Sequence, residues 1–145
     1  MGRRKVLDIL QAAAAEIGDE VKQECDDLIV ITHDKIEYFL LIDEKDRTFC
    51  LYHVVKGLKG ELTEKEFDFV LDIVKDFYPN CDGVWNEQCS YVTSPWYRAV
   101  VNRKTISGET LGKIVDKFME IWSFALVNAG LITDETVCGG VEEQT

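Results

Sequence analysis

The feature that most constrains this chain is a run of strand-forming segments that have no polar face. Residues Leu28–Thr32, Lys35–Asp43 and Arg47–Val55 are rich in β-branched, aromatic and aliphatic residues and are separated by short polar breaks. A sheet with one wet side should instead alternate apolar and polar residues. Leaving about six large apolar side chains in water would forgo on the order of 10 kcal/mol, which rivals a domain's net stability. Both faces of these strands therefore need a cover.

Two arrangements would bury both faces of these strands. The chain's own helices could divide over both faces, which would give a self-sufficient monomer. Alternatively, its helices cover one face, and the second face is completed by a copy of the chain or by a client segment. We expect the second arrangement, because the predicted middle helix is short, the sheet is five strands wide, and large exposed apolar patches mark interaction sites.

Helix signals flank the strands. Apolar residues recur with helical spacing over residues 3–17, and Gly18 follows as a terminating residue. Thr63–Glu66 forms a capping box for a second helix, which Pro79 stops. Ser107 begins a last helix that ends at Gly130.

Two further strands are predicted between the second and third helices, at Gly83–Thr93 and Trp96–Arg103. A shorter lead-in strand is an option at Val21–Cys25. The sequence therefore predicts an α+β fold of order α-β-β-β-α-β-β-α, with an antiparallel sheet packed with helices. We expect a single domain over residues 1–130 and a flexible acidic tail, which contains glycine, over residues 131–145.

Charge and processing signals narrow the class of protein. The chain has 16 Lys and Arg against 27 Asp and Glu, a net charge of −11, which argues against nucleic acid and anionic membranes as partners. Its apolar stretches fall short of the ~20 residues that cross a membrane. Asp8 and Gln11 interrupt what would be the apolar part of a signal peptide. With five scattered cysteines and no export signal, we expect a cytoplasmic protein with reduced thiols.

The chemistry-bearing residues do not assemble into an enzyme pattern. Cys50 and His53 are three apart, so on a strand they point to opposite faces. We interpret His33 as a solvated turn residue and His53 as a hydrogen-bonded core or interface histidine. Carboxylate pairs such as Asp26-Asp27 lie where turns favour them. We expect no catalytic residue, no metal site and no cofactor.

The element order, the long meander ending at Val55 and the capped helix at Thr63 resemble small bacterial type III secretion chaperones. They also resemble the sensory-transduction-regulator-like proteins of bacteria that share the chaperone fold. The resemblance covers approximately residues 3–130. It implies a non-catalytic homodimer that holds an extended partner segment along apolar patches. The tail containing Cys138 and the aromatic residues near Trp85 depart from that pattern.

We therefore predict a chaperone-like protein-binding module, a homodimer that engages a client segment through apolar sheet or helix surface. The alternative is a regulatory or small-ligand-binding protein with an apolar pocket between the sheet and the last helix. Aromatic side chains dominate binding surfaces, so the candidate partner-binding residues are aromatic, although a plain core role stays open for each. The candidates are Tyr38, Tyr52, Trp85, Tyr91, Trp96 and Tyr97.

Overall fold

The computed structural model describes residues 4–56, 63–79, 81–83, 91–101 and 106–129. The chain forms two compact units, which we describe separately. The first unit comprises residues 1–51 and 98–117, and the second comprises residues 52–97 and 118–145. The two units are compact regions of the chain. The single domain over residues 1–130 stays a prediction. The tail over residues 131–145 lies outside the described residues.

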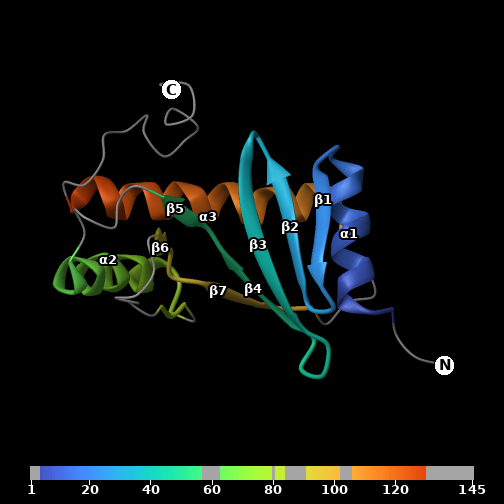
Figure 1. Ribbon diagram of the computed structural model, residues 1–145, viewed down its shortest axis with the longest axis horizontal. Coiled ribbons are helices and arrows are strands. Elements are labelled where there is room, and N and C mark those ends of the chain that lie inside the picture. The colour runs from blue at the N-terminus through green and yellow to red at the C-terminus, as the bar shows by residue number, and fades with distance from the viewer. Residues whose placement is uncertain (1–3, 57–62, 80, 84–90, 102–105, 130–145) are drawn as a thin grey trace. The chain divides into compact units, whose positions relative to one another are not determined.

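The predicted α+β fold is confirmed, with three helices and a five-stranded sheet (Figure 1). The elements are α1 (Val6–Glu16), β1 (Glu20–Cys25), β2 (Leu28–His33), β3 (Ile36–Asp43), β4 (Thr48–Tyr52), β5 (Val54–Lys56), α2 (Glu64–Phe77), β6 (Tyr91–Thr93), β7 (Tyr97–Val100) and α3 (Gly108–Asn128). The optional lead-in strand is a regular edge strand, β1. The predicted strand Arg47–Val55 is interrupted at His53, so it forms both β4 and β5.

The large sheet has the strand order β1-β2-β3-β4-β7. The pairs β1-β2 and β2-β3 are antiparallel, and Ile31 of β2 lies opposite Val21 and Tyr38. The amide of Val101, just after β7, donates to the carbonyl of Arg47, just before β4, at 2.7 Å. The short strands β5 and β6 form a separate antiparallel pair. The predicted strand at Gly83–Thr93 is therefore represented, in the described residues, by β6 outside the large sheet.

The turn between β2 and β3 lies one residue later than predicted. Its residues are Asp34 and Lys35, which have φ angles of 51° and 71°. Two consecutive positive φ angles define a tight hairpin turn whose twist matches the flanking strands. His33 is therefore the last residue of β2 and not a turn residue.

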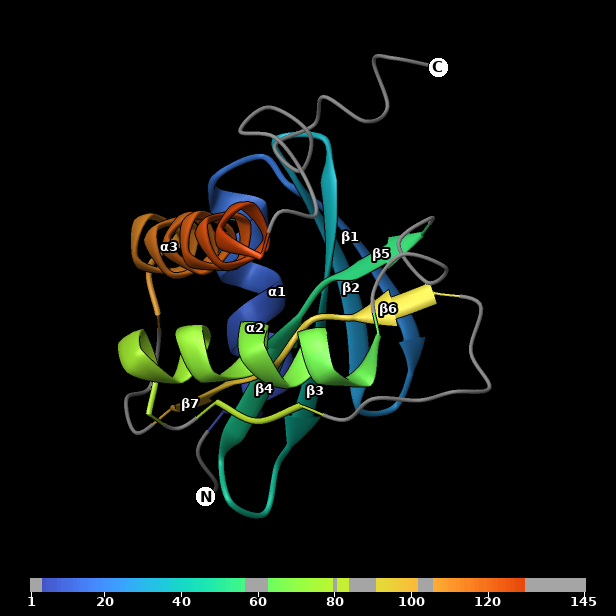
Figure 2. The same cartoon turned by 90° about the vertical axis from the view of Figure 1, so that its left-hand side faces the viewer.

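One face of the sheet, which we call the inner face, is covered by α1 and by the first part of α3. Both helices lie on the same side of β1, β2 and β3 (Figure 2). The inner face is dry, with its side chains at most 7% exposed. Its residues are Ile29, Ile31, Ile36, Tyr38, Leu40, Ile42, Phe49 and Leu51. Gly108 permits close packing of α3, because a Cβ there would lie 2.7 Å from the carbonyl oxygen of Ala13 in α1.

The second unit forms around α2 and the second half of α3. The predicted capping box is present, since the Thr63 hydroxyl accepts from the Glu66 amide and the Glu66 carboxylate accepts from the Thr63 amide. Helix α2 buries Phe67, Val70 and Val74. The second half of α3 buries an apolar set consisting of Phe118, Met119, Ile121, Trp122, Ala125 and Leu126.

Helix α1 begins with a cap supplied from a distant turn. Lys5, its N-cap residue, makes no side-chain capping bond. Instead, the Glu44 carboxylate accepts from the amides of Val6 and Leu7, each at 2.9 Å. A negative charge at a helix N-terminus also interacts favourably with the helix dipole. Glu44 therefore fixes the start of α1 to the turn between β3 and β4.

We predict that Glu44→Ala lowers the free energy of unfolding by about 1–2 kcal/mol, because two amides at the start of α1 lose their acceptor. Urea denaturation followed by circular dichroism measures this loss. Lys45→Ala, in the same exposed turn, is the matched control, and its effect should stay within about 0.5 kcal/mol. Equal stability of the two variants would contradict the capping role.

Candidate partner-binding surface

The opposite face of the large sheet, which we call the outer face, carries no helix among the described residues of the first unit (Figures 1 and 2). On β3 the outer face presents Glu37, Phe39, Leu41 and Asp43. Phe39 is half-buried, and Leu41 is 44% exposed. Phe39 and Leu41 in the middle of the strand are thus apolar, as the sequence indicates, whereas the charged residues Glu37 and Asp43 lie at its two ends.

Strand pairing extends the apolar centre of this face to β2. Val30 lies opposite Phe39, and Leu28 lies opposite Leu41. Residues directly opposite each other on one face of a sheet are in side-chain contact range. We call these four residues, Leu28, Val30, Phe39 and Leu41, the outer stripe. Within the stripe, Val30 is only 6% exposed, Leu28 and Phe39 are half-buried, and Leu41 is the most exposed.

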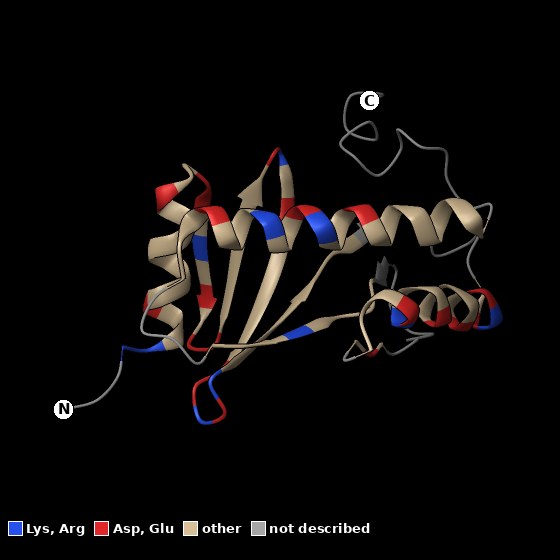
Figure 3. Cartoon of the chain, turned by 180° about the vertical axis from the view of Figure 1, so that it is seen from behind, with Lys and Arg blue, Asp and Glu red and all other residues tan. Residues whose placement is uncertain are grey.

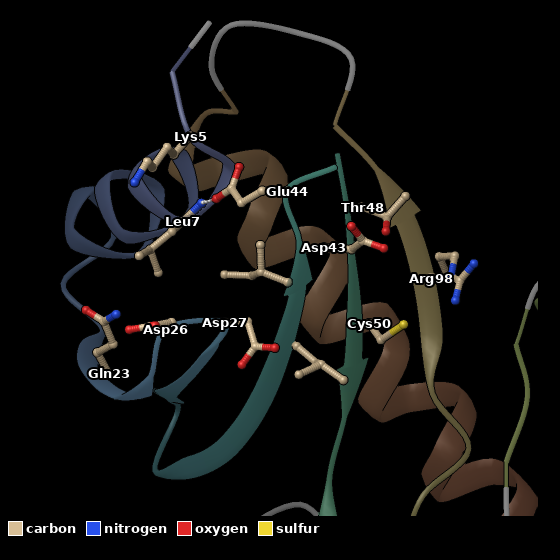
Figure 4. Close-up of a pocket in the computed structure, with 12 residues that line it drawn as sticks. Lys5, Leu7, Gln23, Asp26, Asp27, Asp43, Glu44, Thr48, Cys50 and Arg98 are labelled. Atoms are coloured by element: carbon tan, nitrogen blue, oxygen red, sulfur yellow. Dashed lines mark hydrogen bonds between the residues drawn. The ribbon is translucent and has the colours of Figure 1, made fainter. Parts of the chain in front are cut away.

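A groove of about 810 Å³ lies at one end of the outer stripe (Figure 4). Its walls come from the start of α1, the turn after β1, the end of β3, β4 and β7. The lining residues are Lys5, Leu7, Gln23, Asp26, Asp27, Leu41, Ile42, Asp43, Glu44, Thr48, Cys50 and Arg98. Four carboxylates and two cations line it, so it is a polar, mixed-charge groove and not an apolar ligand pocket.

A second hollow of about 380 Å³ lies at the other end of the outer stripe. It is lined by Val30 and Phe39 together with charged residues of β1 and β3. The full lining is Glu20, Val21, Lys22, Glu24, Val30, Thr32, Glu37 and Phe39. Neither hollow contains a histidine, so the lining of both hollows lacks the commonest general base.

His33 is the centre of a charged cluster on the first unit. Its Nδ1 lies 2.9 Å from Asp19 Oδ2 and its Nε2 lies 3.0 Å from Asp116 Oδ1. The side chains of His33 and Asp19 are only 12% and 8% exposed. The interpretation of His33 as a solvated turn histidine is therefore wrong. Asp19 follows Gly18, whose φ of 78° ends α1 as predicted, and Asp116 comes from α3.

The cluster favours the protonated imidazole. Burial alone would lower the pKa of His33, but the hydrogen bonds and charges of Asp19 and Asp116 outweigh it and raise the pKa above 6.5. Both ring nitrogens can donate at once only in the cation. His33, Asp34 and Asp116 offer ligand atoms within 4.8 Å of one another, close enough for a metal ion. In the structure, the two nitrogens of His33 bind Asp19 and Asp116. These ion pairs connect β2 with the turn after α1 and with α3.

Sequence spacing could not reveal this cluster, because Asp19 and Asp116 are 14 and 83 residues from His33. The available sequence signal was that His33, a polar residue, ends an apolar strand.

His53 has the opposite electrostatic environment, in the second unit. The Trp122 indole donates to His53 Nδ1 at 3.3 Å, and the His53 amide donates to the Ser94 hydroxyl oxygen at 2.9 Å. Burial lowers the pKa of His53 to about 4. The prediction of a hydrogen-bonded histidine is confirmed, and this residue is neutral at physiological pH.

The described residues among the predicted partner-binding aromatics differ in burial and belong to both units. Tyr38 is 2% exposed and belongs to the inner face. Tyr52 is half-buried. Trp96 and Tyr97 are half-buried in the second unit, where the ring centroids of Tyr97 and Tyr78 are 4.4 Å apart. Trp85 lies outside the described residues, and for Tyr91 only the backbone position, in β6, is described.

Exposed apolar side chains that the sequence analysis did not select occur in the second unit. Phe69 and Phe77 of α2 are 52% and 49% exposed, and Phe124 of α3 is 50% exposed. Phe77 and Phe124 form an edge-to-face pair with centroids 5.8 Å apart. The signal that could have found them is their place on the wet side of amphipathic helices.

Comparison with known proteins supports the fold. No protein-family profile matches the chain, and no curated protein sequence matches it. The chain is similar to the crystal structure of YbjN from E. coli, a protein proposed to be a transcription regulator, with a TM-score of 0.55 and 11% identity. The similarity covers 86% of this chain and 90% of YbjN. At this identity the likeness establishes a YbjN-like α+β fold. No helix in the described part of the chain is long and apolar enough to cross a membrane.

The pKa values of the chain's two histidines should be shifted in opposite directions from 6.5. We predict an NMR pKa near 4 for His53 and one above 6.5 for His33. Asp116→Asn should lower the pKa of His33 and leave that of His53 unchanged, which makes His53 an internal control. Two histidines that both titrate near 6.5 would contradict these environments.

The same shifts set the pH dependence of stability. The His53 contribution is fully present above pH 6.5 and is lost as the pH falls toward 4, a change of about 3 kcal/mol. The His33 contribution is present below pH 6.5 and is lost as the pH rises through its raised pKa. Urea denaturation at several pH values measures the sum.

Proposed function

We propose that the protein is a non-catalytic protein-binding module that engages a partner segment through the outer stripe. The observation that carries this proposal is the exposure of Leu41, beside half-buried Leu28 and Phe39, on a sheet face that no described helix of the first unit covers. Fully burying one such side chain contributes about 1.5–3 kcal/mol. A partner that covers the stripe therefore gains useful affinity from apolar contact alone.

The fold is compatible with this function. YbjN is proposed to be a transcription regulator, and the secretion chaperones that the element order resembles act by holding a protein segment. Both roles are carried out by binding and not by catalysis. We propose a chaperone-like role in the cytoplasm. The described cysteines Cys25, Cys50 and Cys81 are free thiols, as a reducing compartment favours.

We also propose that the protein is a homodimer, formed through the helices of the second unit. Phe77 and Phe124 are each about half exposed and contact one another. Aromatic side chains at the centre of an interface supply much of its binding energy. This contact uses side chains of the second unit and none of the outer stripe.

The proposed function is tested by selecting peptides from a random displayed library on the full chain. We expect peptides with micromolar affinity whose binding to Leu41→Ala is weaker by about tenfold, which is about 1.4 kcal/mol. Phe69→Ala removes a similarly exposed apolar side chain from the second unit and is the matched control. It should leave the affinity unchanged.

Circular dichroism verifies that both variants fold, and calorimetry measures the affinity. Peptides that bind Leu41→Ala and the wild type equally, or a library that yields no binder, would disprove the proposed site. A bound small molecule in native mass spectrometry would favour the ligand-binding alternative.

The homodimer is tested by size-exclusion chromatography with light scattering at 10–100 μM, a range in which we expect roughly twice the monomer mass for a dimer of micromolar affinity. Phe124→Asp should give the monomer, because it places a charge in the apolar contact, while Phe69→Asp should stay dimeric. A wild-type monomer at all concentrations would contradict the dimer and leave the outer stripe proposal standing.

A further inference from the structure

The outer stripe lies between two sets of exposed carboxylates. Beyond Phe39, Glu37 lies opposite Thr32, which lies opposite Glu20 of β1, so two carboxylates border the stripe on this side. Lys22, the cation of this hollow, lies opposite Val30 of the stripe. Its ammonium is 3.3 Å from the carboxylate of Glu24, which lies toward the Leu28 end of the stripe. The positive charge on this side is therefore already paired within β1.

On the other side of the stripe, beyond Leu41, the groove of Figure 4 presents Asp26, Asp27 and Asp43, all exposed. Glu44 also lines the groove, but it caps α1. The cations Lys5 and Arg98 lie at the margins of the groove, on the start of α1 and on β7. Carboxylates thus border the apolar centre on both sides along the strand direction.

The opposite side of the sheet has no such arrangement. Along the first half of α3, basic and acidic residues alternate in the chain (Figure 3). Lys113 and Glu109, for example, form an ion pair of 3.2 Å there. On the outer face of the described first unit, in contrast, carboxylates outnumber cations at both borders of the stripe.

The spacing of the two acidic borders indicates the shape of the partner. Glu37 and Asp43 are six residues apart on β3, which corresponds to about 20 Å. A single extended strand is only about 5 Å wide in the plane of a sheet. An α-helix is about 10–12 Å wide, so it leaves about 4–5 Å on each side. A lysine or arginine side chain on each flank of a helix can close such a distance.

The signs of the charges select among candidate occupants. A second copy of the chain has a net charge of −11 and would bring its own acidic borders against these. The chain's residues 131–145 contain four carboxylates and no lysine or arginine. Like charges placed across an interface disfavour association. A basic partner is attracted by both borders.

We infer that the outer face binds a basic amphipathic helix of a partner protein, whose apolar side covers the outer stripe and whose lysine or arginine flanks meet the carboxylates at both borders. This inference rests on the protein-binding function proposed above and names the chemistry of its partner. The helix lies across the strands. Five strands span about 19 Å, which a helix of about 13 residues covers.

Three synthetic 18-residue helical peptides with identical apolar residues test this inference. Their flanking positions are all lysine, all glutamine or all glutamate. Titration calorimetry with the full chain in 50 mM salt should give the highest affinity for the lysine peptide. Binding of the glutamine peptide should be at least tenfold weaker, and the glutamate peptide should not bind. Raising the salt to 300 mM should weaken the lysine peptide most, because salt screens exposed charges.

A charge-matched pair of variants locates the effect. Glu37→Gln should weaken binding of the lysine peptide about threefold, whereas Glu109→Gln, which removes one exposed carboxylate from α3, should not. NMR shifts on binding should concentrate in β2 and β3.

Equal affinities of the lysine and glutamine peptides, both reduced by Leu41→Ala, would overturn the inference and leave the proposed function intact. Failure of all three peptides to bind, or shifts confined to other strands, would overturn this inference, whereas the library selection decides the proposed function. If the chain self-associates and Glu37→Gln strengthens this self-association, the outer face binds a second copy of the chain. That result would also overturn the inference.

Discussion

The dry inner face of the large sheet is the layer on which the rest of the first unit depends. Its side chains are almost completely buried under α1 and the first part of α3. Because interiors are close-packed, the two helices must lie where Gly108 permits contact with the backbone of α1. All the helical cover available in the first unit is used on this side. No described helix of the first unit therefore covers the outer face.

Carboxylates from distant parts of the chain hold this layer at its edges. Glu44 caps α1 from the turn after β3, and Glu16 of α1 accepts from the Gly108 amide at the start of α3, at 2.7 Å. Asp19 and Asp116 bind the two nitrogens of His33. Each contact satisfies a helix terminus or a charged ring that would otherwise remain unpaired at the border of the core. Part of the acidic excess of the chain therefore has a structural role.

The remaining carboxylates have a different effect. Exposed Lys22 and Glu24 on the edge strand β1 discourage uncontrolled strand pairing. On the outer face, Glu20, Glu37 and Asp43 border an apolar centre and repel acidic surfaces, including another copy of the chain. The outer face therefore combines an apolar centre with charged borders, and the second unit exposes Phe69, Phe77 and Phe124.

The sequence by itself determined the element order, the capped helix at Thr63, the end of α1 at Gly18 and the apolar character of both sides of β3. These follow from local rules, because periodicity, caps and left-handed glycines act within a few residues. Only the tertiary structure decided that α1 and α3 share one face, that Tyr38 is core, and that the strand after Arg47 divides at His53. It also decided the surroundings of His33, because Asp19 and Asp116 reach it only through the packing of helices on the sheet. Such contacts join residues far apart in the chain, and no local pattern encodes them.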